Sequence, residues 1–188
     1  MNVYDHDKTI YYPDSSYDFV TYCLRHYPRA VLHALPGLAF TGLLSVRAKV
    51  ETKEWKEEIF SFLPYLDDVE RIVQEFWAEH KQKYQPWYLA QKRPDDLIIS
   101  ASPGFLLQPM CEELGVALIA TEMDPYTGKI HGANCHDEEK VRRFREAYPD
   151  AQIEGFWSDS KADEPMARLA SKAYLVNRDG SRIRWPFL

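Results

Sequence analysis

The spacing of hydrophobic residues changes twice along the chain and predicts three successive regions. The first four residues (MNVY) are long enough for one short strand, which ends directly at Asp5. Between residues 15 and 86, apolar residues such as Phe19 and Cys23 recur at intervals of three and four, as on amphipathic helices. After about residue 95, short apolar runs alternate with helical patterns. The sequence therefore predicts a strand, then a helical block, then an α/β region.

The α/β region contains several short apolar runs that predict strands. Strands are expected over 96–100, 151–157 and 173–177, and helices over 105–114 and 137–148. Gly115 is expected to end the first of these helices. The segments 116–124 and 129–135, joined by the turn PYTGK, predict a β-hairpin.

Strands that alternate with helices are typical of a parallel sheet with helices on both faces. We therefore predict a three-layer, Rossmann-like α/β core. The helical block interrupts the alternation immediately after the first strand. The predicted organisation is a core domain made of residues 1–14 and 87–188, with a helical cap over 15–86 inserted between its first and second strands.

Composition and charge narrow the classes of protein that fit. The 188 residues suit one sizeable domain, and the net charge of −6 argues against a nucleic-acid binder, which needs a basic surface. The three cysteines are far apart and form no CxxC pair, so neither a zinc site nor a disulfide framework is indicated. No apolar stretch is long enough to cross a membrane, and the N-terminus does not read as a signal peptide. A cytoplasmic location, without membrane contact, is expected.

Polar residues follow several of the predicted strands. In open parallel sheets, ligands bind beyond the carboxyl ends of the strands, so these residues are expected to converge on one rim. Carboxylates can bind Mg²⁺, a lysine can neutralise phosphate oxygens, and a hydroxyl can donate to another oxygen. Such a set favours phosphoryl transfer. The residues concerned are Asp5, Asp7, Thr9, Ser100, Lys140, Asp159 and Asp163.

The order of these residues resembles the four motifs of the haloacid dehalogenase superfamily of phosphohydrolases. Asp5-x-Asp7-x-Thr9 resembles motif one, and the apolar run ending at Ser100 resembles motif two. Lys140 matches motif three, and the segment from Asp159 to Asp163 matches motif four. The early helical block resembles the cap of the phosphoserine-phosphatase-like branch. The resemblance covers nearly the whole chain.

The resemblance implies a Mg²⁺-dependent phosphatase that hydrolyses a small phosphorylated metabolite through an aspartyl-phosphate. Asp5 would be the nucleophile, and Asp7 would be the general acid and then the base. This division of labour requires different environments, because Asp5 must stay ionised while Asp7 holds a proton. The remaining roles are phosphoryl binding by Thr9, Ser100 and Ala101; charge compensation by Lys140; metal binding by Asp5, Asp159 and the main-chain carbonyl of Asp7; and support from Asp163.

Within the first motif, two residues depart from the family pattern. His6 stands where an aromatic residue is common, and Lys8 stands where glycine is common. Neither change removes a catalytic group, and Lys8 could influence the choice of substrate.

Some assignments stay open at the level of sequence. Lys129 is a rival to Lys140, Ser102 could be a helix cap rather than a ligand, and Asp163 could cap the helix that begins at Glu164. The tryptophans of the helical block could be core residues or could line the substrate entrance. Candidates to bind a substrate carboxylate are Arg25, Arg29 and Arg47.

Other functions remain as alternatives. The same aspartyl-phosphate could serve a phosphotransferase that passes the phosphoryl group to an alcohol. The DxD sequence could instead bind a metal–nucleotide complex in a glycosyltransferase, although that leaves Ser100 and Asp159 without a role. A non-catalytic phosphate-binding protein would not need the full set of catalytic groups. No obligate protein partner is evident, and the oligomeric state cannot be predicted.

Overall fold

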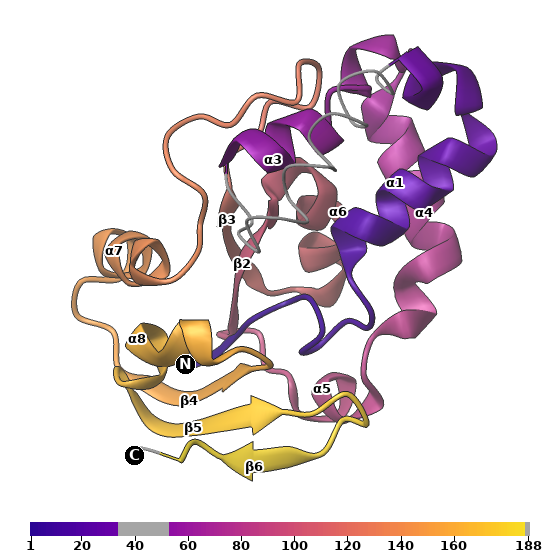
Figure 1. The fold of residues 1–188 in the computed structure, drawn as a ribbon. Helices are drawn as coiled ribbons and strands as arrows, with labels where there is room; N and C mark the ends of the chain where they lie inside the picture. The colour runs from indigo at the N-terminus through magenta and orange to yellow at the C-terminus, as the bar shows by residue number, and fades with distance from the viewer. Residues whose placement is uncertain (34–52, 187–188) are drawn as a thin grey trace.

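In the computed structural model, which describes residues 1–33 and 53–186, six strands form one sheet in the order β3-β2-β1-β4-β5-β6 (Figure 1). The first five strands run parallel and β6 is antiparallel to β5. The strands are β1 (Asn2–Tyr4), β2 (Leu97–Pro103), β3 (Ala117–Thr121), β4 (Ile153–Ser158), β5 (Ala170–Val176) and β6 (Arg182–Arg184). The predicted α/β class, with a mostly parallel sheet, is confirmed.

The first strand of the chain lies in the middle of the sheet. Val3 is in register with Leu97 of β2 on one side and with Phe156 of β4 on the other. Because β1, β2 and β4 are parallel neighbours, their carboxyl ends meet at one edge of the sheet. The residues that follow these three strands are therefore brought together.

Helices cover both faces of the sheet, with α7 and α8 on one side and α1, α4 and α6 on the other (Figure 1). The α-helices are α1 (Ser15–His26), α3 (Lys53–Ile59), α4 (Val69–His80), α5 (Pro86–Gln91), α6 (Gly104–Leu114), α7 (Glu138–Ala147) and α8 (Glu164–Ala167). Short 3₁₀ helices lie at Leu63–Tyr65, Lys81–Lys83 and Lys161–Asp163. Residues 28–33 are also helical.

Alternate residues of the strands enter two separate hydrophobic clusters. Tyr4 and Ile98 point into the cluster on the α6 side, whereas Val3 and Leu97 point into the cluster that contains Phe144 of α7. This alternation follows from the two-residue period of a strand. It explains why the strands of the sequence read as nearly continuous apolar runs, since both faces are buried.

The helical block shares its hydrophobic cluster with the sheet. Phe19 of α1 and Phe76 of α4 belong to the same cluster as Leu106 and Met110 of α6. The indole Nε1 of Trp77 also donates a hydrogen bond of 2.6 Å to the main-chain oxygen of Leu106. The helices α1 and α4 are thus packed against one face of the core. The domain boundaries at residues 14/15 and 86/87 stay a prediction.

Two helix ends lie at residues that favour helix termini. Asp68 caps α4 by accepting a hydrogen bond of 3.0 Å from the main-chain N–H of Arg71. Gly115 ends α6 with a positive φ of 70°, a conformation that glycine adopts without strain. The sequence also predicts a helical region that is broken at Pro36-Gly37, and this break lies outside the described residues.

The predicted hairpin over 116–135 is confirmed only at its tip, where the main-chain N–H of Asp124 donates to the oxygen of Lys129 at 2.8 Å and that of His131 donates to the oxygen of Glu122 at 2.8 Å. Its first arm is β3, which pairs in parallel with β2, for example Ala117 with Leu97. Its second arm forms only an isolated antiparallel bridge between Met123 and Ile130. The first arm finds a longer partner in the buried strand β2 than in the polar segment that follows the turn. The edge strand β6 was not predicted, because only three residues form it and two of them are arginines.

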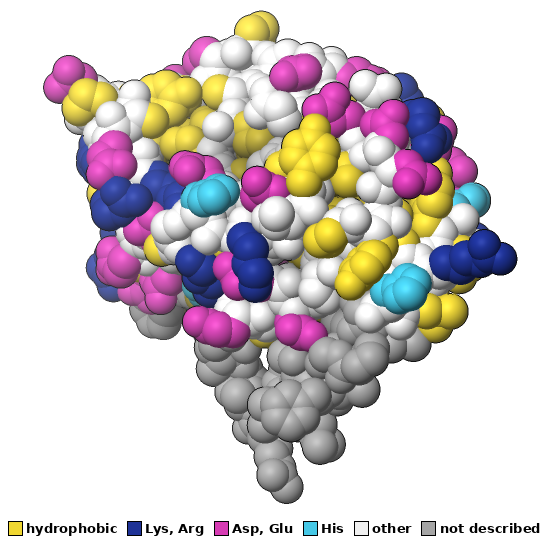
Figure 2. Space-filling view, turned by 90° about the horizontal axis from the view of Figure 1, so that it is seen from above, with side chains coloured by type: hydrophobic (Ala, Val, Ile, Leu, Met, Phe, Trp, Pro, Cys, Tyr) yellow, Lys and Arg dark blue, Asp and Glu magenta, His cyan; other side chains and the backbone are white. Residues whose placement is uncertain are grey.

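The surface carries charges of both signs. On the face seen in Figure 2, Lys and Arg side chains are interspersed with Asp and Glu side chains, and hydrophobic side chains lie between them. Of the helices in the described part of the chain, none is long and apolar enough to cross a bilayer.

Candidate active site

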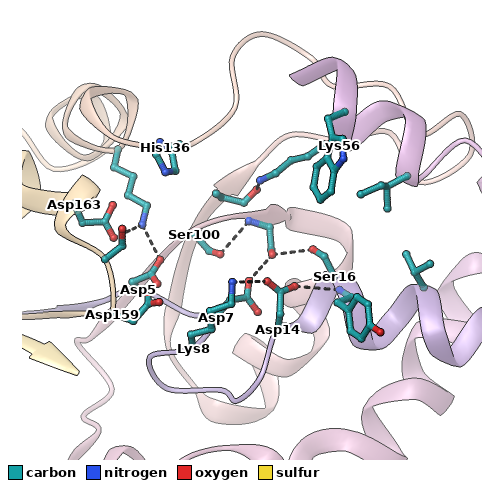
Figure 3. A pocket seen from close by; sticks show the side chains of 18 of the residues that line it. Asp5, Asp7, Lys8, Asp14, Ser16, Lys56, Ser100, His136, Asp159 and Asp163 are labelled. Atoms are coloured by element: carbon teal, nitrogen blue, oxygen red, sulfur yellow. Dashed lines mark hydrogen bonds and ion pairs between the residues drawn. The ribbon is translucent and has the colours of Figure 1, made fainter. Parts of the chain in front are cut away.

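A cavity of about 750 Å³ lies at the carboxyl ends of β1, β2 and β4 (Figure 3). Two groups of residues line it. The polar floor comes from the strand ends and from the helices that follow them: Asp5, Asp7, Ser100, Lys140, Asp159 and Asp163. The apolar wall comes from α1, α3 and the residue after α3: Tyr17, Val20, Trp55, Ile59 and Phe60. The cavity therefore has a charged end and an apolar side.

Asp5 follows β1 directly and is fixed by the strand beside it. Its main-chain N–H donates to the oxygen of Trp157 at 2.9 Å, which extends the pairing of β1 with β4. Its carboxylate accepts hydrogen bonds from Lys140 Nζ at 2.7 Å and from Thr9 Oγ1 at 3.2 Å. Burial raises the pKa of Asp5, and the ammonium of Lys140 opposes that rise.

Lys140 is almost fully buried and lies between two carboxylates. It is 2% exposed, and its Nζ is 2.7 Å from Asp5 Oδ1 and 2.8 Å from Asp163 Oδ2. Burial alone would lower the pKa of Lys140, but the charges of Asp5 and Asp163 outweigh it and raise the pKa above its ordinary value. Asp163 also accepts a hydrogen bond of 2.7 Å from Ser158 Oγ. A permanently charged ammonium therefore faces the Asp5 carboxylate.

The structure distinguishes Lys129 from Lys140 as the lysine that contacts Asp5. Lys129 lies in the exposed loop after β3, where its Nζ pairs with Glu57 Oε2 at 3.0 Å. It does not line the cavity. Of the two lysines, only Lys140 contacts Asp5.

Asp7 has a different set of partners from Asp5. Its carboxylate lies 3.2 Å from His6 Nδ1, accepts from the main-chain N–H of Ser15 at 2.6 Å, and accepts from the hydroxyl of Ser102. Burial would raise the pKa of Asp7, but the charge of His6 and these hydrogen bonds hold it well below its usual range. The pKa values of the two carboxyl groups thus differ, as expected. The direction of this difference is opposite to the one expected, because the pKa of Asp5 is raised and the pKa of Asp7 is lowered.

His6 links Asp7 to the aromatic cluster on the α4 side. Its side chain is fully buried, and Nε2 lies 2.8 Å from the hydroxyl of Tyr84. The imidazole stacks on Tyr11, with ring centroids 5.5 Å apart. The neighbouring Lys8 has a positive φ of 59°, the backbone conformation that favours glycine, and its Nζ lies 3.3 Å from Asp14 Oδ2.

The predicted phosphoryl-binding residues surround Asp5. Thr9 Oγ1 donates to Asp5 and accepts from the main-chain N–H of Asp159 at 2.9 Å. Ser100 lines the cavity, and its Oγ accepts from the N–H of Ser102 at 3.0 Å. The main-chain oxygen of Ala101 is engaged by Lys56 Nζ at 2.7 Å. Ser100 and Ala101 therefore line the cavity, whereas Thr9 is fully buried, lies outside the lining and contacts Asp5 instead.

The chemistry of the donor set around Asp159 fits a divalent cation. Desolvation and then the negative charge of Asp5 raise the pKa of Asp159 to about 7. Two neighbouring carboxylates that repel each other form a place where a hard cation can bind. Mg²⁺ would take the carboxylates of Asp5 and Asp159 and the main-chain oxygen of Asp7. Among residues 1–33 and 53–186, no group of three or more His, Cys, Asp or Glu side chains is arranged to bind a metal ion. The Mg²⁺ site would therefore consist of two carboxylates and one main-chain oxygen.

Three further predictions change with the structure. Ser102 is not a helix cap: Pro103 holds the N-cap position of α6, and the Ser102 hydroxyl binds Asp7 instead. The Asp163 carboxylate does not cap α8, because it pairs with Lys140. Arg25 and Arg29 are exposed and lie outside the cavity lining, so neither can bind a ligand in it. Arg47 lies outside the described residues.

Sequence patterns contain no clear signal for the other residues around the cavity. Lys56 has the same helical spacing as any solvent-facing lysine, yet it is buried and binds Ala101 and Asn134. Trp55 and Ile59 could be assigned either to a core or to a substrate entrance, and the structure places both at the cavity. Only the tertiary arrangement of α3 distinguishes these outcomes.

Comparisons with known proteins agree with this geometry. The family model described as haloacid dehalogenase-like hydrolase matches residues 3–168. A histidinol-phosphatase from Neisseria meningitidis is 30% identical over 113 residues, which cover 50% of this chain and 51% of the relative. The protein CicA from Caulobacter vibrioides is 30% identical over 90 residues, covering 44% of this chain and 40% of the relative. The matches thus span about half or less of the length of these relatives.

Solved structures with a similar fold extend over nearly the whole chain. A Bordetella pertussis protein of unknown function has a TM-score of 0.77 and 21% identity, covering 94% of this chain and 89% of that one. A probable phosphoserine phosphatase from Vibrio cholerae has a TM-score of 0.65 and 13% identity, covering 92% of this chain and 55% of that one. At these identities the likeness concerns the fold.

Proposed function

We propose that this chain, which belongs to the haloacid dehalogenase-like hydrolases, is a Mg²⁺-dependent phosphatase that hydrolyses a small phosphomonoester through an aspartyl-phosphate. The prediction of this family from the sequence is confirmed. The observation that carries the proposal is the contact of the Asp5 carboxylate with Lys140 and Thr9 at the closed, charged end of a cavity. The carboxylate is held in place there and faces space for a substrate.

In the first step of the proposed reaction, an Asp5 carboxylate oxygen attacks the phosphorus atom. The bond from phosphorus to the ester oxygen breaks, and Asp7 gives a proton to the departing alcohol. Lys140 offsets the charge that gathers on Asp5 and on the phosphoryl oxygens. The hydroxyl of Ser100, which lines the cavity, would donate to the phosphoryl group, and Thr9, whose hydroxyl already donates to Asp5, would hold the nucleophile in place.

In the second step, Asp7 takes a proton from water, and the water oxygen attacks the phosphorus of the aspartyl-phosphate. The bond from phosphorus to Asp5 breaks, inorganic phosphate leaves, and the free carboxylate returns. Mg²⁺ held by Asp5, Asp159 and the Asp7 main-chain oxygen would supply positive charge beside the phosphoryl group.

Asp7 must carry a proton for the first step, although its partners favour the ionised form in the free protein. A bound phosphate dianion raises the pKa of a nearby carboxyl, because like charges disfavour ionisation. Protonation of Asp7 would therefore accompany substrate binding. His6, Ser15 and Ser102 orient the carboxylate for that step.

Release of inorganic phosphate from a panel of phosphomonoesters tests the proposal. The panel should include a generic aryl phosphate, O-phosphoserine and histidinol phosphate, with Mg²⁺ in one series and EDTA in the other. We expect phosphate release with Mg²⁺ and none with EDTA. Transfer to an added alcohol without phosphate release would identify a phosphotransferase, and no reaction with any ester would reject the phosphatase.

A further inference from the structure

We infer that the alcohol part of the substrate carries an aromatic or heteroaromatic ring, which binds against the apolar wall. This inference rests on the proposed phosphatase function, since the phosphoryl group must first be placed at Asp5. A phosphomonoester bound in this way extends from the polar floor towards α1 and α3. The chemistry of those two helices then selects the alcohol.

The apolar wall is built from flat and branched side chains. Trp55, Ile59 and Phe60 line the cavity from α3 and the residue after it, and Tyr17 and Val20 line it from α1. Aromatic rings prefer offset or edge-on contact with other rings, which adds to the gain from burying them. Two of the five wall residues, Tyr17 and Trp55, offer such a ring, and a third ring, that of Phe60, is buried behind them. The wall therefore suits a ring better than it suits a short polar group.

One part of the wall is held firmly from behind. Phe60 is 1% exposed, and its ring lies 6.5 Å from that of Phe19, 6.3 Å from that of Phe62 and 6.1 Å from that of Phe105. A side chain fixed on several sides keeps its rotamer and loses little freedom when a ligand binds. Phe60 therefore provides a rigid surface at the cavity.

The helix α3 is anchored by polar contacts along one side, and Ile59 packs against the hydrophobic cluster. Lys53 Nζ donates to the oxygen of Gly132 at 3.0 Å, Lys56 Nζ to the oxygen of Ala101 at 2.7 Å, and Glu57 accepts from the N–H of Ile130 at 2.9 Å. Residues three and four apart share a helix face, so these three point the same way. Trp55 and Ile59, four residues apart, share another face and line the cavity. The polar face of α3 thus anchors the helix while its apolar face meets the ligand.

The lysines that line the cavity are engaged by the protein, and the other basic residue that the structure describes in the lining, His136, lies just before α7 rather than on the apolar wall. Lys8 pairs with Asp14, Lys56 with Ala101 and Asn134, and Lys140 with Asp5 and Asp163. Among the described residues, the apolar wall itself contains no cation that could bind the carboxylate of an amino-acid substrate. This distribution favours a ring over a zwitterionic amino acid such as phosphoserine.

The test compares 3-phenylpropyl phosphate, propyl phosphate and O-phosphoserine as substrates of the full chain with Mg²⁺. The first two release primary alcohols of similar acidity, so a difference in kcat/KM between them reports binding of the added phenyl group rather than a difference in leaving-group chemistry. We expect kcat/KM for 3-phenylpropyl phosphate to exceed the other two by about tenfold or more. Trp55→Ala and Tyr17→Ala should each lower the ratio of the phenylpropyl to the propyl value, whereas Tyr126→Ala, an exposed aromatic in a loop, should keep it.

The possible outcomes distinguish failure of the aromatic-ring inference from failure of the proposed phosphatase function. Equal or lower kcat/KM for 3-phenylpropyl phosphate overturns the inference while leaving the phosphatase intact. Failure to hydrolyse any of the three esters counts against the proposed function itself. If Trp55→Ala does not fold, calorimetric binding of 3-phenylpropylphosphonate and propylphosphonate to the unaltered protein decides: tighter binding of the phenyl compound by about tenfold supports the inference, and equal binding rejects it.

Discussion

The polar floor and the apolar wall of the cavity are stabilised in different ways. On the floor, Lys140, Asp5 and Asp163 are joined by charged hydrogen bonds of 2.7 and 2.8 Å in a buried setting. On the wall, the residues that face the cavity contribute apolar surface, and the polar contacts of α3 lie behind it. The floor depends on the geometry of individual atoms, whereas the wall depends on shape and area.

We therefore expect the polar floor to determine the rate of the chemical step and the apolar wall to determine the choice of substrate. A change on the floor should affect every phosphoester by a similar factor, because all of them place a phosphoryl group at Asp5. A change on the wall should alter the ratio between substrates. Substitutions on the floor therefore provide the strongest tests of the comparison.

The largest effect is expected from Asp5→Asn. An amide is a far weaker nucleophile than a carboxylate, so kcat should fall by about 10⁴-fold or more for every ester tested. The fold should be kept, because the amide oxygen can still accept from Lys140 and the amide NH2 can donate to the hydroxyl oxygen of Thr9. Phosphate release and circular dichroism measure the two effects. Asp150→Asn, an exposed residue after α7, is the matched control and should retain full activity. Wild-type turnover in Asp5→Asn would reject the nucleophile.

A smaller loss is expected from Lys140→Met. Removing the ammonium should lower kcat by about 10²–10³-fold, because charge that develops at the phosphoryl group is no longer compensated. The variant should also be less stable by about 3–5 kcal/mol, since Asp5 and Asp163 are left buried without their shared cation. Steady-state kinetics and urea unfolding measure these effects, with Lys172→Met on exposed β5 as the control. Different factors for phenylpropyl and propyl esters would contradict the separation of floor and wall.

The smallest effect concerns pH and the melting temperature Tm without metal. Desolvation and the charge of Asp5 raise the pKa of Asp159 to about 7 from an ordinary value of 3.8, so the folded protein holds this proton more tightly than the unfolded chain does. The stabilisation is complete below about pH 4 and is lost as the pH rises through about 7. Tm should therefore fall by a few degrees between pH 5 and pH 8. Asp159→Asn should show a weaker fall, and Mg²⁺ at pH 8 should restore Tm. Identical profiles for both proteins would contradict the expectation.

The sequence predicted the floor better than the wall, for a physical reason. The carboxyl ends of parallel strands must meet, so Asp5, Ser100 and Asp159 could be placed together from strand positions alone. The sequence also named Lys140, although it could not separate it from Lys129. That distinction required the position of α7 against the sheet.

Contacts between distant segments were beyond the reach of sequence patterns. The bond from Ser102 to Asp7 and the contact of His6 with Tyr84 join residues 95 and 78 positions apart. Periodicity shows that a helix has an apolar face, but it does not show whether that face meets a core or a cavity. For this reason Trp55 and Lys56 could be assigned only after α3 had been placed.

The central position of β1 has a consequence for the order of events during synthesis. The strand β1 precedes both of its neighbours in the sequence and pairs on one side with β2 and on the other with β4, so its second partner is made only when Ile153–Ser158 appears. Asp5 likewise precedes its ammonium partner by 135 residues. Contacts of such long sequence separation form late and slow the folding of a chain. The catalytic end therefore cannot be completed until β4 and Asp163 have been made, after most of the helices of the described chain.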